Sequence, residues 1–156
     1  MSKPSRGAQM MKTVYVASKV RHAPMWLKLR QQGYAINSTW IDDVGKGQTK
    51  DYAELAARCL KEIQNADALI LFCRPGEILK GALIEAGAAL ALGKQVFCIG
   101  KNHTLSDVFK SHPNWKTFKT LLAALRAVKG SSPCRSINSI CLDKNDGQHV
   151  KNGRKN

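Results

Sequence analysis

Acidic residues are scarce in this chain. Its 156 residues include 11 Asp and Glu against 25 Lys and Arg, which gives a formal net charge of +14 at pH 7. Such an excess of positive charge favours anionic partners, either nucleic acid or small phosphorylated ligands. The charge is not gathered in one block, since residues 129–156 hold only six Lys and Arg against two Asp. A small anionic ligand therefore explains the charge as well as a polymer does.

Long apolar runs are also missing. No run approaches the roughly 20 residues needed to span a bilayer, and residues 1–12 are polar and basic, without the apolar segment of a signal peptide. We therefore expect a cytoplasmic protein and no contact with a membrane.

Several cofactor and nucleic-acid motifs are absent. The five cysteines form no CxxC pair, which argues against a zinc or redox site and favours reduced thiols. No GxGxxG follows the first predicted strand, which argues against a dinucleotide-binding domain. An RNP-like aromatic motif, a helix-turn-helix pattern and a zinc-finger spacing are missing as well, so nucleic acid is an unfavoured partner. We expect no metal and no cofactor.

What is present is an alternation of short apolar runs with amphipathic segments, which is typical of a parallel sheet covered by helices. The pattern predicts strands at 13–17, 34–40, 67–73 and 95–100, with a weaker one at 115–118. It predicts helices at 24–33, 52–63, 81–93, 105–110 and 120–128. The predicted fold class is α/β: a small doubly wound (Rossmann- or flavodoxin-like) parallel sheet of four to five strands, with helices on both faces.

The length suits one domain with its own core. We place the folded unit at 12–128, after a flexible N-terminal segment at 1–11. Residues 129–156 are basic, rich in Ser, Asn, Lys and Gly, and show no sustained apolar period, so we expect a disordered tail.

In a doubly wound sheet the ligand lies beyond the carboxyl ends of the strands. That rule selects the loops at 18–23, 41–50, 74–81 and 101–104.

Glu85 is the most unusual residue of the chain, because it lies within an otherwise apolar, small-residue helix at 81–93. An ionised carboxylate is costly to remove from water unless it is paired. Either Glu85 lies on the wet side of the helix or caps a neighbouring backbone group, or the carboxylate has a chemical role.

Three segments together resemble a known family. They are Val14-Tyr15-Val16-Ala17-Ser18, Ala66-Asp67-Ala68-Leu69-Ile70-Leu71, and Gly81-x3-Glu85-x-Gly87-x-Ala89-x3-Gly93-Lys94. This pattern resembles the nucleoside 2-deoxyribosyltransferase superfamily, which includes deoxynucleoside-monophosphate N-glycosidases. The resemblance covers about residues 13–99, with a looser similarity to small phage-type relatives at His112-Pro113.

The resemblance implies that Glu85 is the catalytic nucleophile, which attacks the anomeric carbon of a deoxyribose and displaces the base. A carboxylate on one face of a sugar suits this chemistry, because the transition state resembles an oxocarbenium ion. Gly81, Ala82 and Gly87 would let the sugar approach closely, or they serve only the packing of helix on sheet. The resemblance also implies a homo-oligomer whose site is completed across an interface.

Two positions depart from the family pattern. Leu79 stands where many relatives have Asp or Ser, and Cys59 where many have Asp. Catalysis would then be slow or lost unless another acid substitutes. Asp42, Asp43 and Glu77 are possible substitutes, although each is more simply interpreted as a solvated loop acid.

Six further residues are predicted to bind substrate: Ser18, Arg21, Trp40, Asp42, Arg74 and Gly81. Ser18 and Arg21 follow the first strand beside a helix start, a setting that suits a phosphate but also an ordinary basic loop. Trp40 would stack on a base or belong to the core. Asp42 would then accept hydrogen bonds from the amino edge of that base.

The sequence therefore predicts cleavage or transfer at the N-glycosidic bond of a (deoxy)nucleoside or its 5′-monophosphate. One alternative is a non-catalytic protein of the same fold that binds or senses a nucleotide. A second alternative is a nucleic-acid accessory protein, whose binding would weaken steeply with salt.

Overall fold

The computed structural model describes residues 11–46, 50–100 and 106–130. At its centre lies a four-stranded parallel sheet with the strand order β1-β2-β3-β4. The strands are β1 (Val14–Ala17), β2 (Ala68–Phe72), β3 (Gln95–Ile99) and β4 (Trp115–Phe118). The predicted α/β class is confirmed, and four of the predicted strands are present.

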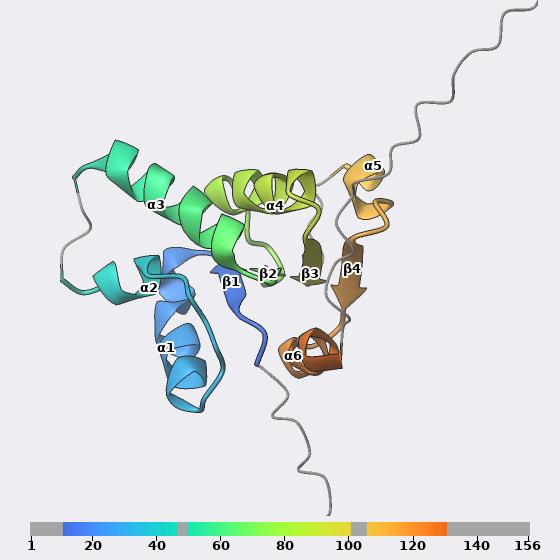
Figure 1. Cartoon of the computed structure of the whole chain (residues 1–156), viewed down its shortest axis with the longest axis horizontal. Helices are drawn as coiled ribbons and strands as arrows, with labels where there is room; N and C mark the ends of the chain where they lie inside the picture. The colour runs from blue at the N-terminus through green and yellow to red at the C-terminus, as the bar shows by residue number, and fades with distance from the viewer. Residues whose placement is uncertain (1–10, 47–49, 101–105, 131–156) are drawn as a thin grey trace, which may run out of the picture.

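Helices cover both faces of this sheet. They are the 3₁₀ turn η1 (Val20–His22), α1 (Ala23–Gln31), α2 (Trp40–Asp43), α3 (Tyr52–Asn65), α4 (Gly81–Ala91), α5 (Asp107–Lys110) and α6 (Leu121–Gly130). Figure 1 shows α3 and α4 on one face, with α1 and α6 on the other. The predicted doubly wound arrangement is confirmed.

Alternation along the strands supplies a core to each face, because successive side chains point to opposite sides. On β1, Tyr15 belongs to the core under α3 and α4, whereas Val16 belongs to the core that contains α1 and α6. On β2, Leu69 and Ile70 divide in the same way. All five residues of β2 are buried, as expected for a strand covered on both faces.

The predicted strand at 34–40 is wrong. Only Ile36 makes a parallel bridge, to Val14. Beyond it the Ser38 side chain takes the place of backbone pairing, since its hydroxyl oxygen accepts the Val16 N–H at 2.7 Å. The Arg30 guanidinium donates hydrogen bonds to the carbonyl groups of Ile36 and Ser38, at 3.1 and 2.7 Å. The segment therefore lies beside β1 as in a five-stranded sheet, but does not extend the ladder.

Other predicted segments differ at their ends. The loop predicted at 41–50 begins inside α2, and residues 47–49 lie outside the described residues. The loop at 101–104 and the tail from 131 onward also lie outside them, as do residues 1–10. Helix α6 continues to Gly130, two residues past the predicted boundary at 128. Among the described residues, no helix has the length and apolar character needed to cross a bilayer.

Small side chains bring α4 close to the sheet. Ala82, Ala86 and Ala89 lie along one side of the helix and are buried in the core beside β1 and β2. Alanine side chains are short, so α4 lies close to the sheet. Glu85, which lies beside this row of alanines on the helix, can therefore reach Tyr15 of β1.

Candidate active site

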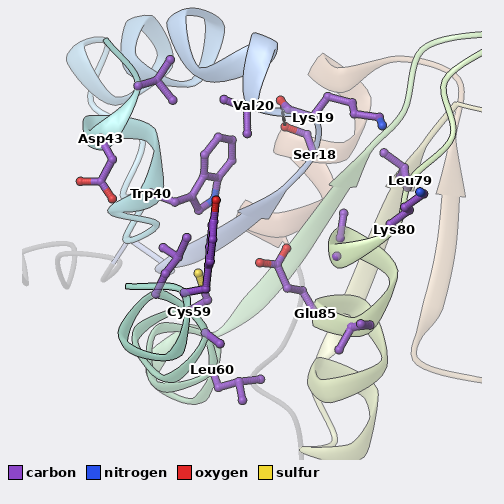
Figure 2. A pocket seen from close by; sticks show the side chains of 17 residues that line it. Ser18, Lys19, Val20, Trp40, Asp43, Cys59, Leu60, Leu79, Lys80 and Glu85 are labelled. Carbon is purple, nitrogen blue, oxygen red and sulfur yellow. Dashed lines mark hydrogen bonds between the residues drawn. The ribbon is translucent and has the colours of Figure 1, made fainter. Parts of the chain in front are cut away.

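A cavity of about 470 Å³ lies at the carboxyl ends of β1 and β2. Its walls come from the loop after β1, from α2 and α3, and from the start of α4 (Figure 2). The chain leaves β1 toward one face and β2 toward the other, so the cavity is at the point where the winding of the sheet reverses. Ligands bind at this point in doubly wound folds, and the volume suits a small molecule.

Glu85 points from α4 into this cavity (Figure 2). Its Oε1 atom accepts a hydrogen bond of 2.8 Å from the hydroxyl of Tyr15, which is fully buried on β1. Leu79 and Cys59, the two positions that depart from the family pattern, are buried and form part of the cavity wall. The carboxylate therefore has a single strong donor in a largely apolar setting.

This setting changes the acidity of both partners. Burial raises the pKa of Glu85 above its ordinary value, and hydrogen bonds from Tyr15 and Cys59 only partly oppose the increase. Burial and the nearby Glu85 charge raise the pKa of Tyr15 far above its usual range. Tyr15 therefore remains a neutral donor that orients the carboxylate and leaves the second carboxylate oxygen toward the cavity.

Two lysines add positive charge to the cavity. Lys19 follows β1 and Lys80 precedes α4, and both line the wall. Among the described residues, neither has an acidic side chain within ion-pairing distance. These ammonium groups are thus available to an anionic ligand.

Four of the predicted site residues, Glu85, Ser18, Trp40 and Gly81, do line the cavity. The Ser18 hydroxyl accepts a bond of 2.9 Å from Trp26 and donates one of 3.2 Å to the Lys19 carbonyl. Trp40 is not at the end of a strand but begins α2, and its indole N–H donates to the Val16 carbonyl at 2.9 Å. One edge of its ring is thereby fixed.

The other three predicted residues lie outside the cavity wall. Asp42 accepts two bonds from Arg30, at 2.9 and 2.8 Å, which occupies both carboxylate oxygens. Arg21 donates to Glu77, and the backbone N–H of Arg74 does the same. The structure therefore does not bring these three groups together with Glu85.

The possible substitute acids are all engaged. Asp43 lines the cavity but forms an ion pair of 2.8 Å with Arg58 of α3. Glu77 is not the solvated loop acid that the sequence predicts, because its side chain is only 1% exposed and is bound by Arg21 and His22. None of these carboxylates replaces the acid that is missing at Leu79 or Cys59.

Tyr15, Lys19 and Lys80 lie in or beside the cavity but are not among the predicted site residues. The only signal for Tyr15 is a polar-tipped aromatic within an apolar strand, and its pairing with Glu85 depends on the packing of α4 across β1. Within the described residues, no group of three or more His, Cys, Asp or Glu is arranged to hold a metal ion.

The fold is α/β of the doubly wound class, and its switch point carries a cavity of a size that suits a small molecule. No family model and no curated protein matches the sequence. Solved structures do match. A CMP N-glycosidase from Clostridium botulinum superposes with a TM-score of 0.51 at 18% identity, over 77% of this chain and 100% of that one.

A 2-deoxyribosyltransferase from Bacillus psychrosaccharolyticus superposes with a TM-score of 0.56 at 17% identity, over 80% of this chain and 98% of that one. Both neighbours are consistent with the superfamily that the sequence resembles. At this level of identity they establish the shared fold.

Proposed function

We propose that this protein cleaves or transfers at the N-glycosidic bond of a nucleoside or its 5′-monophosphate, with Glu85 as the nucleophile. One observation carries the proposal: a half-buried glutamate, oriented by Tyr15, faces a nucleotide-sized cavity at the switch point of this fold. The two structural neighbours, a CMP N-glycosidase and a 2-deoxyribosyltransferase, support the same class of chemistry.

The proposed reaction has two steps. In the first, a Glu85 oxygen forms a bond to the anomeric carbon, and the glycosidic bond breaks with its electron pair on the base, which takes a proton from water. In the second, water or another base attacks the same carbon and releases the Glu85 carboxylate. Water gives hydrolysis, whereas a second base gives transfer.

Lys19 and Lys80 support a phosphorylated substrate in place of a free nucleoside. Both lysines line the cavity that contains Glu85, and a monophosphate would give them the anionic partner that neither has among the described residues. In this proposal they contact the phosphate together with Ser18, which lines the same cavity, and take the place of Arg21, which does not.

A second candidate function is nucleotide binding without catalysis. It is favoured by the apolar side chains at Leu79 and Cys59, and by the ion pairs that occupy Asp42 and Asp43. A nucleophile without a neighbouring acid to protonate the leaving base would bind its ligand and turn it over slowly.

Exposed apolar side chains beside the cavity support the homo-oligomer that the resemblance implies. Tyr52 and Leu60 of α3 and Ile84 of α4 are 71%, 48% and 73% exposed, and all three line the cavity. A second copy that covered them would also close the cavity to water. Sedimentation velocity tests this arrangement directly.

The function is tested by chromatography of free base released from a panel of nucleosides and 5′-monophosphates, including CMP, dCMP, dAMP, dGMP and dTMP. Each is incubated with and without an acceptor base, and with wild-type protein or Glu85→Gln. Glu85-dependent release supports the enzyme, and dependence on the acceptor separates transfer from hydrolysis. Binding of the same nucleotides without any release would instead support the second candidate.

A further inference from the structure

The Glu77 carboxylate joins two loops that are 55 residues apart in the chain. Its Oε1 atom accepts hydrogen bonds from Arg21 Nε at 2.7 Å, from Arg21 Nη2, and from His22 Nε2 at 2.8 Å. Its Oε2 atom accepts the backbone N–H of Arg74 at 2.8 Å. The first loop follows β1 and the second follows β2, so this carboxylate ties together the ends of two neighbouring strands.

The second loop is shaped to present this side chain. Glu77 N–H donates to the Arg74 carbonyl at 3.1 Å, and Gly76 between them has φ +78°, a conformation that glycine adopts without strain. Burial opposes ionisation of Glu77, but the Arg74 N–H, Arg21 and His22 outweigh it and lower its pKa to about 2. Glu77 is therefore ionised at neutral pH. We call its bonds to Arg21, His22 and the Arg74 N–H the Glu77 bridge.

The same two loops carry both lysines of the cavity. Lys19 lies two residues before Arg21, and Lys80 lies three residues after Glu77. Glu77 itself is absent from the cavity wall, as are Arg21 and His22. Any effect of Glu77 on a ligand in the cavity must therefore act through the position of the loops.

A second route links the bridge to the cavity. The His22 ring packs edge-on against Phe72, with the ring centroids 5.0 Å apart, and Trp26 packs on Phe72 in the same way at 5.8 Å. Trp26 in turn donates to the Ser18 hydroxyl in the cavity wall. A shift of His22 would thus reach Ser18 through packed rings as well as along the chain.

We propose that Glu77 is a positioning residue that fixes the spacing of Lys19 and Lys80, and so determines the affinity of the cavity for an anionic ligand. This inference rests on the proposed function. Glu85 is held separately, by Tyr15 and by the packing of α4. Loss of Glu77 should therefore weaken binding while leaving the chemical step at Glu85 nearly unchanged.

The test compares the full-length wild type with Glu77→Gln, which keeps the shape but not the charge, and with Glu77→Asp, which keeps a carboxylate. Asp67→Ala is the matched control, because it removes a 2.7 Å bond to the Thr13 N–H at the amino ends of β1 and β2, the ends opposite to Glu77. KM and kcat are measured for the monophosphate that the wild type cleaves. Amide hydrogen exchange is measured at 18–22 and 74–81.

We expect Glu77→Gln to raise KM about tenfold or more with kcat within about threefold of wild type. Exchange should accelerate in both loops. Glu77→Asp should recover part of the affinity and also covers the case in which Glu77→Gln fails to fold. Asp67→Ala should leave KM unchanged.

Two results would overturn the inference. One is an unchanged KM in a Glu77→Gln protein of lowered melting temperature, which would make the bridge a contact for stability only. The other is a lower KM, which would mean that Glu77 withholds Arg21 from the ligand.

If the wild type neither binds nor cleaves any nucleotide, the proposed function fails. The hydrogen-exchange data then test only whether Glu77 fixes the two loops. Faster exchange of Glu77→Gln in both loops supports this role, and unchanged exchange at 18–22 overturns it.

Discussion

Glu85 and Glu77 are two carboxylates withdrawn from water near the carboxyl ends of β1 and β2, and their surroundings shift their pKa values in opposite directions. Glu85 faces a cavity with Tyr15 as its one strong donor, and burial raises its pKa. Glu77 is enclosed by Arg21, His22 and the Arg74 N–H, which lower its pKa to about 2 despite burial.

The contrast separates a reactive group from a structural one. A carboxylate whose hydrogen-bonding capacity is filled by cations has little left to offer a ligand. One that is desolvated and only partly satisfied gains stability by contact with a developing positive charge. Burial alone would not distinguish the two, whereas the number and charge of the donors does.

Glu85→Gln should produce the largest effect. The amide keeps the shape of the side chain but cannot act as the nucleophile, so base release should fall by at least about 10³-fold. Nucleotide affinity, measured by tryptophan fluorescence, should stay within a few fold of wild type. Asp67→Asn, which changes an acid at the amino end of β2, away from the cavity, serves as the control and should retain full activity. Equal rates for Glu85→Gln and wild type would remove Glu85 from the mechanism.

Glu77→Gln should produce the largest loss of stability. It exchanges a buried, charged acceptor for an amide, which weakens the bonds from Arg21, His22 and the Arg74 N–H, and we expect a cost of about 2 kcal/mol in the free energy of unfolding. Because the folded pKa of Glu77 is lowered from 4.5 to about 2, its stabilisation is complete above pH 4.5 and is lost as the pH falls toward 2. Urea unfolding at several pH values checks this, and a pH-independent difference would contradict it.

Tyr15→Phe should alter the pH dependence of activity. The Tyr15 hydroxyl lowers the pKa of Glu85, so its removal should raise that pKa further and shift the acid limb of the pH–rate profile upward. On that limb we expect a rate about tenfold lower than wild type. Tyr34→Phe, whose ring lies under Lys129 in a different part of the protein, is the matched control. An unshifted acid limb would show that Tyr15 does not control the ionisation of Glu85.

The smallest effect should be a gain in stability from Glu85→Gln. The raised pKa of Glu85 means that its ionisation costs stability as the pH rises above 4.5. At pH 7 the variant should be slightly more stable than wild type. The difference should shrink as the pH falls below 4.5, where the unfolded carboxyl group also becomes protonated. Calorimetry at pH 7 and pH 4 measures the stability of both proteins. A Glu85→Gln variant that is no more stable than wild type at pH 7 would contradict the prediction.

Sequence periodicity predicted the parts of the fold that depend on burial. β2 is apolar throughout and is covered on both faces, and α3 forms where a helix was predicted, with Cys59 and Ile63 buried. The prediction of a strand at 34–40 is wrong because the Ser38 side chain, and not the backbone, pairs with the Val16 N–H. The alternation of apolar residues does not indicate whether a backbone hydrogen bond is replaced by one from a side chain.

Site residues that stand out in the local sequence could be predicted. Residues whose role depends on contacts between distant segments could not. Glu85 is conspicuous within an apolar helix, whereas the role of Glu77 depends on Arg21 and His22 from another loop. Lys19 and Arg21 are equally plausible phosphate ligands in the sequence. Only the fold shows that Lys19 lines the cavity while Arg21 is bound by Glu77.

The most direct test of the contrast is a carbon-detected NMR titration of the glutamate carboxyl groups in the wild-type protein, with Glu85→Gln and Glu77→Gln used to assign the two signals. We predict that Glu85 titrates above 4.5 and that Glu77 stays ionised down to about pH 2. A Glu85 carboxyl group that titrates at or below 4.5 would contradict it, because the cavity would then hold a solvated acid and not a desolvated nucleophile.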